Sequence, residues 1–320
     1  MRSILITALL FIATSTCFAQ RQNVYFLKNN GEYVQNRDSA DYIRVVREPD
    51  SSSTLYNVFE YYPNGRQKLI GKSSVIDPPK FEGTCIRYYA NGSKQLVSNY
   101  KGGQLIGNEY EFYPNGKPYK VGKYTEDINH NVAIHNYQIT AEYDSLGTAL
   151  VTDGNGYYRG FDSKFKSIID EGNLKDGKRD GQWKGKDLDL HVSYIETYVN
   201  GNLISGVSVG KEGDSVKYSK IRSVEPAYKG GLKAFYGYLG RNIHYPDYEK
   251  THNIQGKVIA SFVVEKDGSI TDVKIVSHVT VNIDDEATRV IKESPKWIPG
   301  TEYGRKVRVQ YSIPISFALN

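Results

Sequence analysis

The stretch Tyr61-Tyr62-Pro63-Asn64-Gly65 returns in slightly changed form at residues 88–92 and 112–116. A looser copy, Tyr198-Val199-Asn200-Gly201, lies further along the chain. An Asn-Gly pair between aromatic or β-branched runs is a strong hairpin signal, because both central residues of a type I′ turn need positive φ. Each copy therefore predicts a β-hairpin whose turn lies at Asn-Gly.

Repeated hairpins predict an antiparallel sheet over residues 55–215, in which each unit contacts mainly its neighbours. The 27 tyrosines and 30 glycines also favour strands and tight turns over long helices. Residues 143–147, followed by Asp153-Gly154-Asn155-Gly156-Tyr157, are predicted to be a degenerate member of the series with different turns. Residues 20–54 are harder to place, but Val24–Leu27 and Tyr42–Val46 each have the pattern of a strand, which we expect at the edge of this sheet.

The sequence pattern changes near Ile221 and now indicates helices. The first helical face consists of Leu232, Phe235, Tyr236, Leu239 and Ile243. This helix should end before Tyr245-Pro246, because the residue preceding a proline avoids the α region. The second helical face consists of Ile283, Ala287, Val290 and Ile291, and its first turn carries Asp284, Asp285 and Glu286, where the helix dipole favours negative charge.

Three strands accompany these helices. Gly256–Val264 is a nearly unbroken β run, so we expect both of its faces to be covered. Asp267-Gly268 turns the chain into a return strand at Ile270–Val276. The last strand, Val307–Phe317, alternates apolar and polar residues. Residues 221–320 are thus predicted to form a small α+β domain with a three-stranded antiparallel sheet and two helices, which makes the whole chain α+β.

The last strand is also predicted to be an edge strand. Pro314 lies within it, and a proline inside a sheet belongs on an edge or at a bulge because it has no amide hydrogen. An exposed edge strand can pair with another chain unless something blocks it. This edge is the feature of the sequence with the most direct physical route to function.

The composition argues against several functional classes. The net charge of +5 is spread along the chain, so we expect no nucleic-acid partner. With two cysteines and six histidines, a metal site is improbable, and His130 and His135 have no Cys or carboxylate at ligand spacing. Cys85 has no histidine nearby in the sequence, and no catalytic or phosphate-binding motif appears. We therefore expect a protein without enzymatic activity and without cofactors.

Residues 1–19 have the order of a cleavable signal peptide: Arg2, an apolar run over Ile4–Ala13, and small residues before the cut after Ala19. The expected location is the periplasm. An uncleaved inner-membrane anchor facing the periplasm is the alternative, although the apolar run is short for a membrane span. Lipid attachment at Cys17 is a further alternative, disfavoured because no aliphatic residue precedes it at the usual position.

The repeats resemble MORN-type repeats in the Tyr-Tyr-Pro-Asn-Gly variant found in bacterial envelope proteins. The resemblance covers roughly residues 55–210, with a poor match around 120–165. It implies an architecture rather than a function. The tyrosines are either an aromatic ladder that binds glycan or protein, or cross-strand packing within a thin sheet, and packing is the simpler interpretation.

Residues 225–320 resemble the C-terminal domain of TonB, the energy transducer of Gram-negative bacteria, in the version found in Bacteroidetes-type envelopes. The motifs that carry the resemblance are Glu225-Pro226, Gly230-Gly231, Phe235, Leu239, Asn242-Ile243, Tyr245-Pro246, Gly256-Lys257-Val258, Phe262-Val263-Val264, Asp267-Gly268-Ser269-Ile270, Pro295-Lys296-Trp297, Pro299-Gly300 and Ile313-Pro314-Ile315.

The resemblance implies that the domain binds the TonB box, a short extended segment of outer-membrane TonB-dependent receptors, by adding it as a strand. The receiving residues would be those of the last strand and its flank, together with two residues after the first helix. They are Asn242, Tyr245, Val307, Arg308, Val309, Gln310, Tyr311 and Ser312. The chain would then take part in transport across the outer membrane.

Two departures from a full transducer affect this interpretation. The N-terminus reads as a cleavable signal, so inner-membrane motor proteins are expected as partners only if it is retained. With 11 prolines in all, the chain also has no proline-rich spacer that could cross the periplasm. The alternative function is an envelope scaffold that binds cell-wall glycan or a partner protein through the tyrosine-rich repeats.

Overall fold

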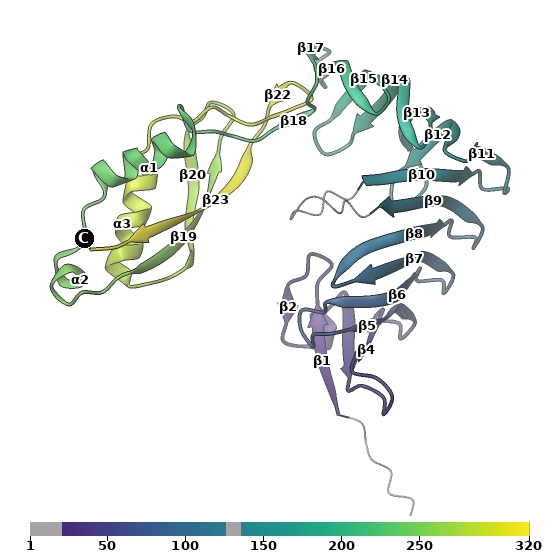
Figure 1. Cartoon of the computed structure of the whole chain (residues 1–320), viewed down its shortest axis with the longest axis horizontal. Helices are drawn as coiled ribbons and strands as arrows, with labels where there is room; N and C mark the ends of the chain where they lie inside the picture. Colours follow the sequence, from purple (N-terminus) through teal and green to yellow (C-terminus); the bar gives the residue numbers. More distant parts are fainter. Residues whose placement is uncertain (1–20, 126–135, 320) are drawn as a thin grey trace, which may run out of the picture. The chain divides into compact units, whose positions relative to one another are not determined.

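The computed structural model describes residues 21–125 and 136–319 (Figure 1). The chain divides into two compact units, Met1–Gly154 and Asn155–Asn320. The predicted signal peptide, residues 1–19, lies outside the described residues. His130 and His135 also lie outside them.

The first unit is built of antiparallel strands, most of which pair with their neighbours in the sequence. The strands are Gln22–Leu27 (β1), Tyr33–Val34 (β2), Tyr42–Arg47 (β3), Tyr56–Tyr61 (β4), Gln67–Ser73 (β5), Phe81–Tyr88 (β6), Lys94–Lys101 (β7), Gln104–Phe112 (β8), Pro118–Thr125 (β9), Asn136–Tyr143 (β10) and Ala149–Thr152 (β11). A short 3-10 helix, Arg37–Ser39, precedes β3. The two strands predicted before residue 55 are confirmed as β1 and β3, which pair with each other, and β3 continues into the sheet through β4.

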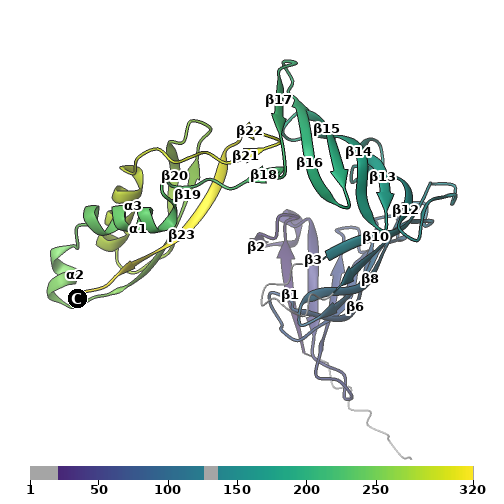
Figure 2. The same ribbon diagram turned by 45° about the horizontal axis from the view of Figure 1, so that its top comes forward.

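The second unit continues with repeat-type strands and ends in a mixed domain (Figure 2). The repeat-type strands are Asn155–Phe161 (β12), Ile168–Lys175 (β13), Lys178–Asp187 (β14), Val192–Val199 (β15), Asn202–Val209 (β16) and Ser215–Tyr218 (β17). The C-terminal elements are Ser223–Val224 (β18), Gly231–Asn242 (α1), Asp247–Thr251 (α2), Gly256–Val264 (β19), Ile270–Ser277 (β20), Val281–Lys292 (α3), Thr301–Glu302 (β21), Arg305–Lys306 (β22) and Val309–Phe317 (β23). The sheet of β20, β19 and β23 confirms the predicted three strands, but the short helix α2 was not predicted.

The predicted hairpins are confirmed, but a type I′ turn occurs only in the last copy. At Asn200-Gly201 both residues have positive φ, 50° and 83°. In the first copy Gly65 has positive φ, 80°, and Asn64 does not. There the Asn64 side chain accepts a hydrogen bond from the Arg66 amide at 3.0 Å, as Asn91 and Asn115 also do from the second residue after them. This local bond favours a wider loop with a single left-handed glycine.

The first part of the degenerate member, residues 143–147, has the same loop as the first copy, whereas Asp153 and Gly154 in its second part both have positive φ, 49° and 77°, and so form a different turn, as predicted. The Asp144 amide donates to the Thr148 carbonyl, as the Tyr62 amide donates to the Arg66 carbonyl in the first copy. The Asp144 carboxylate replaces the asparagine by accepting from the Leu146 and Thr148 amides at 2.9 and 2.8 Å. The loop geometry therefore depends on a side-chain acceptor rather than on the Asn-Gly pair.

Glycines and aromatic residues face each other across neighbouring strands of the second unit. Trp183 lies directly opposite Gly172, and a Cβ on Gly172 would lie 2.5 Å from its indole ring. The same relation joins Tyr194 to Gly185 and Tyr218 to Gly206. The ring of each aromatic residue covers backbone that a glycine leaves open. The abundance of tyrosine and glycine in this unit therefore has a packing explanation.

The core of the C-terminal domain lies between its sheet and helices α1 and α3 (Figure 2). Helix α3 buries the four apolar residues predicted for it, and Thr280 caps its N-terminus by accepting from the Ile283 amide. Helix α1 buries only Phe235 and Leu239. Leu232 and Tyr236 are 48% and 45% exposed, so the predicted face of α1 was too wide.

Strand β19 buries one face fully against the helices through Val258, Ala260, Phe262 and Val264. Its other face is not covered along its whole length as predicted, because Ile259 is 37% exposed. In the described ranges, 21–125 and 136–319, no helix has the length and apolar character needed to cross a membrane.

Candidate partner-binding edge

Strand β23 is an edge of the three-stranded sheet, whose order is β20-β19-β23, as the sequence predicted. It pairs with β19 over nine consecutive residue pairs without a register shift, from Val264↔Val309 to Gly256↔Phe317. The opposite edge, β20, has two register shifts against β19, and Asp272 within it has a φ of 50°. Bulges discourage pairing at an edge. Of the two edges, β23 is therefore the one suited to accept a further strand.

Pro314 reveals which way the amides of β23 point. It pairs with Ile259. Because proline has no N–H to donate, Pro314 and Ile259 form a non-hydrogen-bonded pair. The backbone nitrogen of Pro314 therefore points away from β19. Residues two apart in a strand direct their amides to the same side, so the N–H groups of Gln310, Ser312 and Ser316 also point outward. These are the donors available to an added strand.

The predicted strand began two residues too early. Val307 and Arg308 lie between β22 and β23, because residues 301–306 form a small hairpin that the alternating pattern of the sequence does not indicate. The Val307 amide donates to the Gly300 carbonyl at 2.9 Å. The Arg308 guanidinium donates from Nε to Glu265 at 2.8 Å and also pairs with Asp272. Val307 and Arg308 are therefore bonded to other parts of the domain, precede β23 and do not form part of its edge.

The acidic groups near the start of β23 are already satisfied. Hydrogen bonds from Thr271 and then Arg308 lower the pKa of Glu265. Hydrogen bonds from the Lys296 and Ser269 side chains hold the pKa of Asp267 well below its usual range. The side chain of Gln310 donates to the Ser261 hydroxyl at 2.9 Å, so it bonds to the neighbouring strand. The start of β23 thus offers backbone donors rather than unpaired charge.

Tyr245 lies near the other end of the strand, whereas Asn242 is the last residue of α1. The Tyr245 ring packs edge-to-face on Phe317, the last residue of β23, with ring centroids 5.9 Å apart, and its hydroxyl donates to the Ile254 carbonyl at 2.6 Å. The Asn242 side chain donates to the Tyr238 carbonyl at 2.7 Å. At about 3.4 Å per residue, Phe317 is about 20 Å along the strand from Tyr311. Of the predicted residues, Val309, Gln310, Tyr311 and Ser312 therefore lie on the edge strand, whereas the others lie outside it, and the set does not gather in a single pocket.

One contributor to this edge was missed from the sequence. Ser316 follows the same alternation as Gln310 and Ser312, and it is exposed. The alternating pattern of the last strand could have identified it. Three outward amides, two before Pro314 and one after it, thus define the candidate edge.

Tyrosine hydroxyls of the repeats, the alternative site, are engaged within the sheet. The second aromatic residue of each of the first three copies is a tyrosine that donates to a backbone carbonyl of the next repeat: Tyr62 to Tyr88 at 2.8 Å, Tyr89 to Phe112 at 2.7 Å and Tyr113 to Tyr143 at 2.9 Å. Burial raises the pKa of Tyr89 and of Tyr113 to about 12. These bonds favour the packing interpretation of the tyrosines.

In the described part of the chain, no three His, Cys, Asp or Glu residues gather in a way that could hold a metal ion.

Comparison with known proteins agrees with this edge being part of a TonB-like domain. Residues 241–319 match the family model of the Gram-negative bacterial TonB protein C-terminal. Over 76 residues the chain is 34% identical to Protein TonB of Helicobacter pylori (strain ATCC 700392 / 26695). The matched region covers 23% of this chain and 25% of that protein. The chain thus spans about a quarter of the length of the curated relative that it matches.

Two solution NMR structures of the Helicobacter pylori TonB C-terminal domain are also similar. The longer has 26% sequence identity and covers 28% of this chain and 80% of its own, with a TM-score of 0.23. The shorter has 27% identity and covers 27% of this chain and 91% of its own, with the same TM-score. The C-terminal part of the chain is thus a TonB-like domain by sequence, preceded by a many-stranded antiparallel sheet.

Proposed function

We propose that this protein is a non-enzymatic interaction protein of the TonB type, which binds TonB-box segments of outer-membrane receptors and so takes part in transport across the outer membrane. The observation that carries the proposal is the regular edge strand β23 within a domain that matches the TonB C-terminal family. An extended segment added there would gain main-chain hydrogen bonds, and pockets for alternate side chains would provide selectivity.

Several finer proposals accompany it. Residues 1–19 are a signal peptide that directs the protein to the periplasm, with an inner-membrane anchor as the alternative. Residues 55–215 form MORN-like repeats, residues 20–54 are N-terminal strands that continue this sheet, and residues 221–320 form the TonB-type domain. Inner-membrane motor proteins are partners if the N-terminus is retained.

A proline substitution at the edge of β23 tests the binding proposal. Ser312→Pro removes an outward donor without removing a hydrogen bond to β19, because the pairing of Ser312 with Ser261 is non-hydrogen-bonded. Ser312→Ala is the matched control, since it keeps the amide and removes only the hydroxyl. We expect the affinity for a receptor's N-terminal peptide to fall at least tenfold in the proline variant and to stay unchanged in the alanine variant. Equal affinity in both variants would refute strand addition at this edge.

The scaffold alternative makes a different prediction. If the repeats bind the envelope partner, deletion of residues 50–210 would release the protein from the envelope while deletion of 221–320 would not. The strand-addition proposal predicts that loss of 221–320 abolishes receptor binding. The two deletions therefore separate the two functions.

A further inference from the structure

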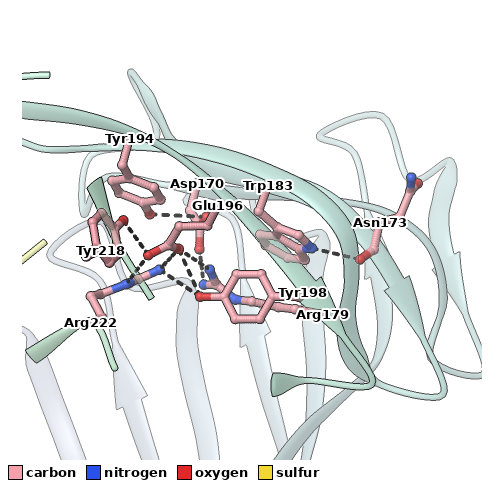
Figure 3. Close-up of polar contacts among 9 residues, drawn as sticks. All are labelled: Asp170, Asn173, Arg179, Trp183, Tyr194, Glu196, Tyr198, Tyr218 and Arg222. Atoms are coloured by element: carbon pink, nitrogen blue, oxygen red, sulfur yellow. Dashed lines mark hydrogen bonds and ion pairs between the residues drawn. The ribbon is translucent and has the colours of Figure 1, made fainter. Parts of the chain in front are cut away.

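A fully buried carboxylate lies on β15, near the end of the repeat-type strands. Glu196 has 0% exposure and accepts hydrogen bonds from the Tyr198 hydroxyl at 2.9 Å and the Tyr218 hydroxyl at 2.7 Å. Arg222 donates to it from Nε at 2.9 Å and also forms an ion pair with it (Figure 3). Arg222 belongs to no strand of the sheet. It lies between β17 and β18, on the segment that leads into the C-terminal domain.

The Arg222 guanidinium lies against two tyrosine rings. Its central carbon is 4.9 Å from the ring centroid of Tyr194 on β15 and 5.1 Å from that of Tyr303. Tyr303 lies in the turn between β21 and β22 and is 6% exposed. Its ring stacks on Tyr194 at 4.9 Å with 18° between the planes, and its amide donates to the Arg222 carbonyl at 2.9 Å. The Arg222 side chain, 27% exposed, thus contacts both the repeat-type sheet and the β21–β22 hairpin.

A second arginine ties the same hairpin to β16. Arg305 on β22 donates from Nε to the Ser208 hydroxyl at 3.0 Å and from Nη2 to the Asp214 carbonyl at 2.6 Å, and it forms an ion pair with the Asp214 carboxylate. Ser208 is fully buried, and its hydroxyl donates to the Tyr303 carbonyl at 2.9 Å. The Ser208 hydroxyl therefore bonds to the Tyr303 carbonyl in the turn of the hairpin and to the Arg305 side chain on β22.

We propose that Arg222, Tyr303 and Arg305 form a clasp that holds the C-terminal domain on strands β15 and β16. The segment between β17 and β18 and the β21–β22 hairpin then open and close together as one cooperative unit. Only Val307 and Arg308 separate β22 from β23. One consequence rests on the proposed function: tension on a segment bound along β23 would pass through β22 into the repeat-type sheet. The clasp itself does not depend on what β23 binds.

Amide hydrogen exchange of the full chain tests the clasp without any ligand. In Arg305→Gln, we expect exchange in residues 218–224 and 300–306 to be at least tenfold faster than in the unchanged protein, while the amides of β19 keep their protection. Arg308→Gln is the matched control. This arginine pairs with two carboxylates, Glu265 and Asp272, but both lie within the C-terminal domain, so exchange in residues 218–224 should not change.

Unchanged exchange of residues 218–224 and 300–306 in a folded Arg305→Gln protein would overturn the proposal. If β19 loses protection in that variant, Asp214→Asn decides instead, because the Asp214 side chain is 58% exposed and its replacement disturbs no core. Faster exchange confined to the two segments in Asp214→Asn supports the clasp, and exchange identical to the unchanged protein refutes it.

Discussion

The hydroxyl of Tyr62 donates a hydrogen bond to the carbonyl oxygen of Tyr88, 2.8 Å away and one repeat further along the chain. Tyr89 and Tyr113 repeat this relation with the next repeats. The tyrosine at the second position of the motif therefore joins each of the first three hairpins to its successor. This explains why a motif that looks like a ligand ladder is needed to build the sheet.

The first prediction concerns this bond. Tyr89→Phe keeps the ring and removes the donor to Phe112, so we expect the free energy of unfolding to fall by about 1 kcal/mol. Tyr88→Phe is the control, because no hydrogen bond of its hydroxyl occurs within the described residues. Urea denaturation measures both variants, and an equal loss in both would contradict the role of Tyr89.

The second prediction concerns the glycines beneath aromatic rings. A Cβ on Gly172 would lie 2.5 Å from the Trp183 ring, and Trp183 is 1% exposed. We expect Gly172→Ala to cost about 1–3 kcal/mol of unfolding free energy, because the ring has no space to move. Gly240→Ala in α1 should have the opposite sign, stabilising by about 0.5–1 kcal/mol, since nothing lies within 4 Å of the added carbon. Thermal denaturation of the two variants compares them, and a neutral Gly172→Ala would contradict the packing account.

The sequence predicted the elements whose information is local. The alternation ending at Phe317 and the four buried residues of α3 were identified correctly, because burial on one face imposes a period on the residues themselves. The turn at Asn64-Gly65 was assigned the wrong type, since the Asn64 side chain competes for the Arg66 amide.

Other features had no local signal. Arg222 and Tyr303 are far apart in the sequence, and nothing in the residues around either one indicates that they stack. Val307 and Arg308 continue the alternating pattern of β23, yet the small hairpin before them ends the edge at Val309. The edge itself was predictable, whereas the contacts that terminate and anchor it depend on the folded chain.

The third prediction concerns the thiol of Cys85, which is 4% exposed and packs with Val46, Val58 and Leu69. Burial raises its pKa to about 11. Because this pKa lies two units above the ordinary value of 9.0, the fraction of Cys85 present as thiolate at pH 8 is about a hundredfold lower than for a free thiol. We expect Ellman's reagent to react with Cys85 at least that much more slowly in the folded protein than in urea, measured with Cys17→Ser so that one thiol is present. Rapid reaction of the folded protein would contradict its burial.

The fourth prediction concerns pH. Burial acts to raise the pKa of Glu196, but the hydrogen bonds from Arg222 and Tyr218 outweigh it and leave the pKa below the ordinary value of 4.5. The unfolded chain then binds this proton more readily than the folded one. The stabilisation is therefore complete above about pH 4.5 and is lost as the pH falls through the lower folded value.

Urea titrations of the unchanged protein and of Glu196→Gln at several pH values measure this effect. The difference in unfolding free energy between the two should shrink as the pH falls from 7 to 3. Arg179, whose Nη1 lies 3.9 Å from Glu196, stays charged over this range and does not change the sign. A difference that is independent of pH would show that the charge of Glu196 does not stabilise the fold.

The most direct test of the central claim is amide exchange along β23, followed by NMR in the full chain with and without a synthetic N-terminal peptide of a TonB-dependent receptor. The outward amides of Gln310, Ser312 and Ser316 have no partner strand, whereas those of Tyr311 and Ile313 point toward β19. Strand addition predicts that the peptide slows exchange at the outward amides at least tenfold and leaves the inward amides unchanged. Peptide binding that protects only amides of β4–β17, with no change at Gln310 and Ser312, would contradict the account.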